Sequence, residues 1–425
     1  MPVSPELLQR AGDLKQELVE FGTRPRYAAF LTEWLADRFD RSVPIDEGTL
    51  AIITDAFILQ QPLEDGRTVL EHFVAAHRRL PEAERAMLLG WRDVVEGVFV
   101  VERREGDALV TTNLVDELPY RLYSNMGPGI FAQLPPRSFL SARLVPIDDA
   151  WMISGAIMPL PAAERAAAYR IAVDLTSRHP ELPLRNPAKL EQARELQRED
   201  RQAFVDFFGS DVVLIPGAAL AERMQAFSRF REYERRDAEG RTHADRAREK
   251  SEREQPLPQT DYGDLVDERM VAVIYDEVEG CYFIPDYDEA EQVFASPELL
   301  RDSYYVELIS AYLEEPSIPP TVLRRLAARD PARASEVFRQ VLGSKGKPGL
   351  LQRASGQRPV DWERDGEALL RRYKPSYFDR PVLPSVTPVS EQLAQIMAET
   401  RRDAGRPAPA SGPKNKDRKK GRRRR

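Results

Sequence analysis

The sequence predicts an α+β fold with a helical N-terminal bundle, a small five-stranded β-barrel-like module, a mixed, mainly helical C-terminal region and a disordered basic tail. Helical periodicity over the first 90 residues, closely spaced β-rich runs after Trp91 and a terminal stretch rich in Lys and Arg predict these parts. With 425 residues, the chain is longer than a typical single domain. We therefore expect several domains.

The predicted helical domain covers residues 1–90. Apolar side chains recur at steps of three and four over residues 27–35, as on the buried face of an amphipathic helix. Residues 49–60 and 69–80 continue this spacing. Pro81 then introduces a further helix, with acidic residues in the first turn where they face the positive end of the helix dipole.

The predicted β module covers residues 91–160. Five short β-rich runs lie within it, separated by turns that contain glycine or proline. These runs span residues 94–103, 108–115, 120–124, 139–145 and 151–158. Strands this short and this close together are typical of a small barrel, either SH3-like or OB-like.

A predicted helical region with a charged linker covers residues 161–260. It contains a charged helix over 188–208 and a short buried strand over 211–216, after which Gly217 opens another helix. The segment 229–254 carries nine Lys and Arg residues against eight Asp and Glu. A nearly balanced mixture of charges with few apolar residues is typical of a solvated helix or a linker.

The last predicted folded domain, residues 261–400, combines a hairpin with helices. Its hairpin strands are expected at 270–276 and 281–285. Helices are expected at residues 286–315, 320–342, 361–373 and 390–400, joined by loops rich in proline and glycine.

The predicted disordered tail, residues 401–425, concentrates positive charge. It holds twelve Lys and Arg residues against two Asp, a net charge of +10, whereas residues 1–400 hold 50 against 67, a net charge of -17. Such a block attracts polyanions through counterion release. The candidate nucleic-acid-binding residues are Lys414, Lys416, Arg418, Lys419, Lys420, Arg422, Arg423, Arg424 and Arg425. The alternative is a solubilising tail that touches the acidic body of its own chain.

Phosphate-binding and metal-binding motifs are not supported. The loop from Gly343 to Gly349 has the wrong glycine spacing for a P-loop, and a dinucleotide fingerprint is absent. His72 and His77 are five residues apart and do not share a helix face. The stretch 361–366 resembles the start of a calcium loop but lacks the glutamate that closes one, so we interpret it as a helix N-terminus.

Acidic residues between 286 and 291 are likewise interpreted as a helix start. Neither a metal nor a cofactor is predicted. Nucleophilic catalysis is also not supported, because no serine elbow occurs and Cys281 lies inside a predicted hairpin, where a buried, unreactive thiol is expected. A single cysteine excludes an intrachain disulfide.

The N-terminus lacks the charged and apolar regions of a secretory signal, and no apolar run is long enough to span a membrane. We therefore expect a cytoplasmic protein without a transmembrane segment.

Several short stretches resemble an uncharacterised bacterial protein family. They include residues 97–101, 151–155, 207–211 and 282–287. Members of this family often end in a SEC-C type zinc motif. The corresponding segment here has Ala408 and Ala410 in place of the ligating cysteines, as part of a Pro-Ala-Pro-Ala-Ser-Gly-Pro-Lys run. The resemblance therefore implies neither zinc binding nor a defined activity.

The expected function is that of a non-enzymatic interaction or regulatory protein, binding nucleic acid or another polyanion through its tail. The barrel face is a lesser candidate for the same role. The sequence leaves open an enzyme of unknown class, with an interdomain site built from scattered polar residues, and the polar loop 123–129 favours this alternative. A structural partner in a larger complex is a third hypothesis.

Overall fold

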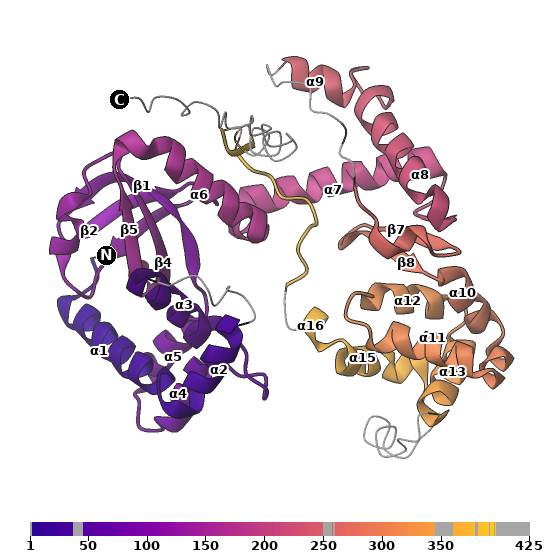
Figure 1. The fold of residues 1–425 in the computed structure, drawn as a ribbon, viewed down its shortest axis with the longest axis horizontal. Coiled ribbons are helices and arrows are strands. Elements are labelled where there is room, and N and C mark those ends of the chain that lie inside the picture. The colour runs from indigo at the N-terminus through magenta and orange to yellow at the C-terminus, as the bar shows by residue number, and fades with distance from the viewer. Residues whose placement is uncertain are drawn as a thin grey trace, which may run out of the picture. The chain divides into compact units, whose positions relative to one another are not determined.

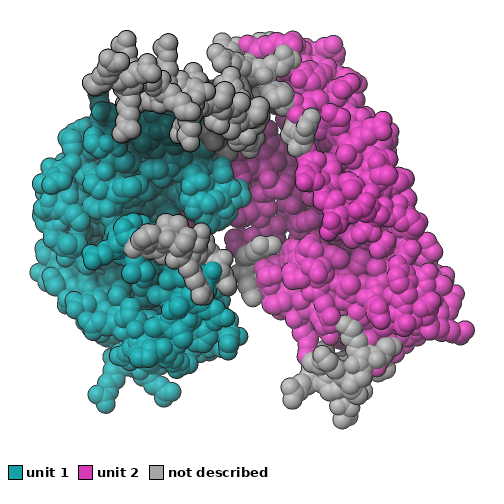
Figure 2. All heavy atoms as spheres, viewed as in Figure 1, with its two compact units in different colours: residues 1–182, 389–425 teal, residues 183–388 magenta. Residues whose placement is uncertain are grey.

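The computed structural model describes residues 2–36, 46–249, 257, 260–344, 360–378, 381–390, 392–394 and 396. The chain forms two compact units (Figure 2). Unit 1 comprises residues 1–182 and 389–425, and unit 2 comprises residues 183–388. Unit 2 is thus inserted between two stretches of unit 1, and the five predicted ranges are distributed over these two bodies.

Five helices form the predicted N-terminal bundle of unit 1 (Figure 1). They are α1 (Pro5–Gly22), α2 (Pro25–Ala36), α3 (Glu47–Gln60), α4 (Val69–Ala76) and α5 (Glu82–Gly90). Three of them begin with a side-chain cap. The Ser4 side chain accepts a hydrogen bond from the amide of Leu7 at the start of α1, and the Asp46 side chain accepts one from the amide of Thr49 at the start of α3. Thr68 and Glu71 form a capping box at the start of α4.

The predicted five-stranded module is a closed barrel. Its strands are β1 (Val95–Glu105), β2 (Ala108–Asn113), β3 (Pro119–Tyr123), β4 (Phe139–Ile147) and β5 (Ala150–Leu160), in the order β1-β2-β3-β5-β4. β3 and β5 are parallel, and β1 pairs with β4 to close the barrel. This order is that of a Greek-key barrel of the OB type, and the loop between β3 and β4 contains a 3₁₀ helix, η1 (Pro128–Gln133).

Alternating side chains fill the barrel and cover its outside. Val95, Phe99 and Leu122 lie in the interior cluster with other apolar residues. On the outside, Val145 and Met152 pack against the helical bundle, because successive strand residues point to opposite faces. The barrel and the bundle therefore share one apolar interface within unit 1.

A second outer face of the barrel is covered by α6 (Arg165–Arg178), which follows η2 (Ala162–Glu164). Val98 and Phe139 of the barrel pack there against Ala172 of α6. Leu393, which is fully buried, joins the same cluster from the far end of the chain.

Unit 2 is built around a three-stranded antiparallel sheet in the order β6-β7-β8. The strands are β6 (Val212–Ile215), β7 (Val271–Asp276) and β8 (Gly280–Pro285), which confirms the predicted strand and hairpin. The prediction that the first strand is buried is wrong, because β6 lies at the edge of the sheet and only Ile215 of its residues is buried. Helices α7 (Pro187–Phe208) and α8 (Gly217–Arg229) contribute to the apolar cluster on one face of the sheet, where Val273 and Tyr275 point.

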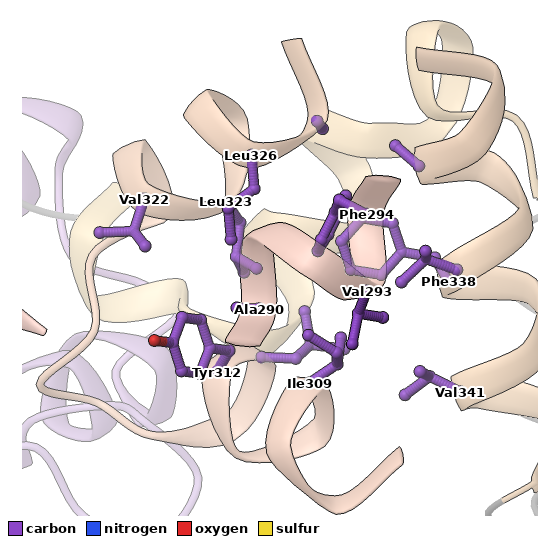
Figure 3. Close-up of a cluster of buried hydrophobic side chains, with 14 of the residues drawn as sticks. Ala290, Val293, Phe294, Ile309, Tyr312, Val322, Leu323, Leu326, Phe338 and Val341 are labelled. Atoms are coloured by element: carbon purple, nitrogen blue, oxygen red, sulfur yellow. The ribbon is translucent and has the colours of Figure 1, made fainter. Parts of the chain in front are cut away.

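Alternate residues of β7, Ala272 and Ile274, point to the opposite face and join a larger apolar cluster. Figure 3 shows the part of this cluster around Phe294 and Phe338. Its helices are α10 (Tyr287–Ala295), α11 (Ser303–Glu314), α12 (Pro320–Ala328), α13 (Pro331–Ser344) and α15 (Trp362–Tyr373). Proline breaks two of the longer helices that the sequence predicts: Pro297 starts the 3₁₀ helix η6 (Pro297–Arg301), and Pro331 starts α13.

Short elements complete unit 2. They are η3 (Leu182–Arg185), the π-helical turn η4 (Phe230–Glu234), α9 (His243–Glu249), η5 (Gly263–Val266) and α16 (Pro375–Phe378), of which η3 begins at the last residue of unit 1. The predicted charged segment 229–254 thus includes η4 and α9, and its residues 250–254 lie outside the described part of the chain. None of the described helices is both long enough and apolar enough to cross a membrane.

Candidate functional site

The nine basic residues predicted to bind nucleic acid lie outside the described residues. They are Lys414, Lys416, Arg418, Lys419, Lys420, Arg422, Arg423, Arg424 and Arg425. The structure describes part of the chain before the tail, as far as residue 396, as well as the barrel face that the sequence offers as a second candidate and the polar loop of the enzyme alternative.

The segment before the tail is fixed on unit 1. Leu393 is fully buried against α6 and the barrel, and Val389 and Ile396 pack around it. Arg165 of α6 donates from Nη2 to Oε1 of Gln392 at 2.8 Å. The predicted tail, which begins at residue 401, therefore starts five residues beyond an anchored helical position.

The outer face of β1, β2 and β3 is the surface that OB-type barrels use for oligonucleotides, an expectation that rests on analogy of fold alone. Arg103 and Arg121 lie on this face, and both pair with Glu105, at 2.6 and 2.5 Å. Hydrogen bonds from Arg103, followed by those from Arg121, keep the pKa of the Glu105 carboxyl below its usual value. The two guanidinium charges are therefore partly neutralised within the protein.

Neither the loops nor the aromatic rings of this face suit a nucleic acid. The β1–β2 loop carries Asp107, and the β4–β5 loop carries Asp148 and Asp149, all of which repel phosphates. Tyr120 lies in the barrel interior and Tyr123 is buried against the helical bundle. Neither ring is available to stack on a base.

The polar loop after β3 lies against α1 and forms a groove with it. One depression of about 360 Å³ is lined by α1 residues and Asn125, and a second of about 370 Å³ is lined by the start of α1, Asp107 and residues 123–128. The two adjoin at Gln9 and Asn125, which line both. Gly12 permits the close approach, since a Cβ atom there would lie 2.9 Å from Cβ of Asn125.

Three carboxylates give the groove its charge. Asp13 accepts a hydrogen bond from Gln9 at 2.9 Å, and Glu20 accepts one from Gln16 at 3.0 Å. Within the described residues, no cation forms an ion pair with these two or with Asp107. The lining of both depressions includes neither histidine nor cysteine. The groove thus offers negative charge and amide groups.

The cation at the floor of the groove, Lys15, is already paired. Its ammonium Nζ lies 2.5 Å from Oδ1 of Asp55, a carboxylate on α3 that is 3% exposed. Arg143 of β4 donates from Nε to the other oxygen of Asp55 at 2.9 Å, and Ser154 of β5 donates to Oδ1 at 2.6 Å. Four elements of unit 1 therefore meet at one buried carboxylate.

The remaining donors of this buried network are also satisfied. Arg143 reaches Oε2 of Glu96 and Oε1 of Gln60, each at 2.6 Å. Burial alone raises the pKa of Asp55, but the charges of Lys15 and Arg143 outweigh it, so that the pKa is lowered overall. The network holds an ionised carboxylate and fixes α1 and α3 on the barrel.

Sequence reasoning did not single out this network. A signal was nevertheless present, because Asp55 is the only charged residue between Leu50 and Gln60, a segment otherwise rich in apolar side chains. A lone acid on a buried helix requires a buried cation as a partner. The partners come from α1, 40 positions earlier, and from β4, 88 positions later, and pattern alone identifies neither.

His72 and His77 each contact a group of the same chain, and the acidic clusters lie at helix N-termini. His72 faces Asp65, whereas Nδ1 of His77 contacts the carbonyl oxygen of Phe73 at 2.8 Å. Asp361 is the N-cap of α15 and accepts from the amide of Arg364. Among the described residues, no group of three or more His, Cys, Asp or Glu side chains is arranged to hold a metal ion.

The acidic residues after Pro285 begin α10, as expected. Asp286 is its N-cap, and Asp288 and Glu289 occupy its first turn. Both first-turn acids pair with Arg269, at 2.5 and 3.2 Å. Burial, followed by the neighbouring charges of Glu268 and Glu289, raises the pKa of Asp286.

The single cysteine is not activated. Cys281 lies in β8 and belongs to the apolar surroundings of the α7–α8 face of the sheet. Burial raises the pKa of its thiol to about 12, and the charge of Asp200 acts in the same direction. A thiol with so high a pKa is almost fully protonated near neutral pH, so it is a poor nucleophile.

Comparison of the chain with protein-family models, with curated proteins and with solved structures found no match.

Proposed function

We propose that the chain is a non-catalytic interaction protein that binds nucleic acid through its basic C-terminal tail. The observation that carries this proposal is the separation of charge, with +10 in residues 401–425 and -17 in residues 1–400. Because counterion release depends on the density of positive charge, the tail supplies the affinity. Binding of this kind is sensitive to salt and indifferent to base sequence.

The anchored segment around Leu393 supports the same proposal. It ties the start of the tail to the barrel unit, so a nucleic acid held by the tail stays close to that unit. The barrel face itself offers paired arginines and acidic loops, and therefore contributes little attraction. The enzyme alternative lacks a comparable observation, since the groove beside loop 123–129 presents amides and carboxylates rather than a nucleophile beside a base.

The direct test compares the full chain with a chain that ends at Thr400, which keeps every described residue. Binding of single-stranded RNA and DNA of about 20 nucleotides is measured by fluorescence anisotropy at about 50 mM salt. The shortened chain is expected to bind at least about a hundredfold more weakly, because it loses most of its phosphate contacts.

A full-length variant with the nine basic site residues replaced by glutamine serves as the matched control for tail length. It is expected to bind as weakly as the shortened chain. Equal binding by the full and shortened chains, or no binding by either at low salt, would show that the tail does not have this role.

A further inference from the structure

The groove between α1 and loop 123–128 is a candidate binding site outside the tail. Its carboxylates Asp13, Glu20 and Asp107 lack ion-pair partners within the described part of the chain. Lys15, which lines the first depression, is held by Asp55, and Arg104, beside the second, donates to the carbonyl oxygens of Gly106 and Pro128. The groove therefore carries three carboxylates that no ion pair among the described residues neutralises.

We propose that this groove binds the basic tail of the same chain, and that nucleic acid must displace the tail from it. The inference rests on the proposed function, because it describes how tail binding is regulated. The occupant is the segment 414–425, which carries nine Lys and Arg residues and one Asp. Because of this contact, the apparent association constant for nucleic acid equals the intrinsic constant multiplied by the fraction of chains whose tail is free.

Charge spacing favours this occupant. Asp13 and Glu20 are seven residues apart on α1, which places them on one side of the helix and about 10 Å apart along its axis. In an extended segment, residues three apart are separated by about 10 Å. The tail offers such pairs of cations in several registers, among them Lys416 with Lys419 and Arg422 with Arg425.

The apolar part of the groove suits long basic side chains. Val19, Leu8 and Met126 line it beside the carboxylates, and Met126 is 79% exposed. The methylene stems of Arg and Lys cover such surface while their charged ends reach a carboxylate. An acidic rim around an apolar strip therefore fits an Arg- and Lys-rich segment better than it fits an anionic ligand.

The tail is long enough to reach the groove. From Ile396 to Gly421 there are 25 residues, which span up to about 80 Å when extended. A folded body of the size of unit 1 has a radius of gyration of about 16 Å, so its diameter is about 40 Å. Because the tail starts from the same unit, no movement between the two units is required.

The first experiment neutralises the groove in the full chain with Asp13→Asn, Glu20→Gln and Asp107→Asn. Binding of a 20-nucleotide RNA is expected to become about three- to tenfold tighter, because exposed ion pairs of modest strength no longer hold the tail. The control variant, Glu33→Gln, Glu64→Gln and Glu102→Gln, has the same change in charge at exposed positions outside the groove. It is expected to change binding less than twofold.

The second experiment measures the contact itself. In a Cys281→Ala background, Gln16→Cys in the groove is combined with Gly421→Cys in the tail, and the rate of intramolecular disulfide formation is compared with that of Glu64→Cys combined with Gly421→Cys. The groove pair is expected to react at least about fivefold faster at low salt, and this advantage should disappear at high salt.

The two proposals fail in different ways. If the groove and control variants bind RNA equally and the two cysteine pairs react at equal rates, the groove does not hold the tail, whatever the tail does with RNA. If the full and shortened chains bind RNA equally while the groove pair still reacts faster, the intramolecular contact stands and the nucleic-acid proposal is wrong.

Discussion

Unit 1 and unit 2 each consist of a sheet covered by helices, but different interactions stabilise the inside of each unit. In unit 1, the helical bundle is fixed to the barrel by a buried ionic network around Asp55 as well as by apolar packing. In unit 2, helices on both faces of a three-stranded sheet meet through two apolar clusters. The comparison teaches that unit 1 depends on charge compensation and unit 2 mainly on close packing, and each dependence can be broken separately.

Removing the carboxylate of Asp55 is expected to have the largest effect. Asp55→Ala leaves Lys15 and Arg143 without their shared partner in a buried place, which costs about 3–5 kcal/mol of the stability of unit 1. Hydrogen exchange of peptides from α3 and β4 reports on this unit, and peptides from β7 and α12 should be unchanged.

The triple variant Lys15→Met, Asp55→Leu and Arg143→Met provides the control. Apolar side chains of similar size remove the need for compensation, so most of the lost stability should return. A triple variant less stable than Asp55→Ala would show that the network is more than charge compensation.

The matching change in unit 2 is Phe338→Ala. Phe338 is fully buried, stacks on Trp362 at 4.8 Å between ring centroids, and meets Phe294 edge-on. Loss of the ring should cost unit 2 about 3–5 kcal/mol, measured by the denaturant dependence of hydrogen exchange in peptides from α13 and α15. Phe338→Leu should recover much of it, and recovery is not expected from any change of charge.

The two units should also respond to pH in different ranges, each gaining stability as the pH rises. The pKa of Asp55 is lowered in the folded state, so its contribution is present above about pH 4 and is lost as the pH falls through the folded pKa. Lys374 in unit 2 is 2% exposed, and burial lowers its pKa to about 8. Between pH 8 and its unfolded pKa of about 10.4, the unfolded chain binds more protons, so unit 2 gains stability as the pH rises.

For Lys374, the expected gain is about 1–3 kcal/mol over that range. Urea unfolding of Cys281→Ala between pH 7.5 and 9.5 is compared with that of Cys281→Ala combined with Lys374→Met, because the raised pKa of the Cys281 thiol would add an opposite pH dependence in this window. Only the chain that keeps Lys374 should gain stability with pH. Equal curves would show that the ammonium, which donates to the carbonyl oxygen of Glu315 at 2.5 Å, is not destabilised by burial.

A smaller effect is expected where unit 2 uses a buried polar group. Gln197 of α7 is 1% exposed and donates to the carbonyl oxygens of Glu277 and Val278 at the hairpin turn, while its Oε1 accepts from the amide of Ser385 at 2.7 Å. Gln197→Ala should cost about 2 kcal/mol, because these groups lose their partners.

The control for this change is Gln202→Ala on the exposed side of the same helix, which should cost less than about 0.5 kcal/mol. Thermal unfolding of both variants decides the point. If both variants lost similar stability, the hydrogen bonds of Gln197 to the hairpin would contribute no more than an exposed side chain of α7.

The smallest expected effect concerns the barrel face. Arg103→Gln combined with Arg121→Gln should change RNA binding by less than about twofold, because both guanidinium groups already pair with Glu105. The measurement is RNA anisotropy with the full chain. A tenfold loss would make the barrel face, rather than the tail, the main contact surface.

The sequence predicts those parts of the fold that are encoded locally. Alternating apolar residues and glycine or proline turns locate the five strands of the barrel, and the hairpin around Gly280 is located in the same way. Pairing between distant segments could not be predicted, because nothing local to β3 indicates that β5 lies parallel to it. The burial of Leu393 against α6 is a contact of the same kind.

The candidate site shows the same division. Composition alone identifies the basic tail, and the polarity of residues 123–129 marks the loop that forms one side of the groove. The other side comes from α1, more than 100 positions earlier, and the approach depends on Gly12. Whether a carboxylate is compensated by a cation depends on tertiary contacts, which residue spacing does not encode.

The salt dependence of RNA binding by the full chain tests the central claim most directly. If the tail supplies the affinity through seven or eight phosphate contacts, the logarithm of the association constant should fall with the logarithm of salt concentration at a slope of about -5 to -6. The slope should be the same for RNAs of unrelated sequence, and it should be absent in a chain ending at Thr400. A slope shallower than about -1, or one unchanged when the tail is removed, would contradict the account.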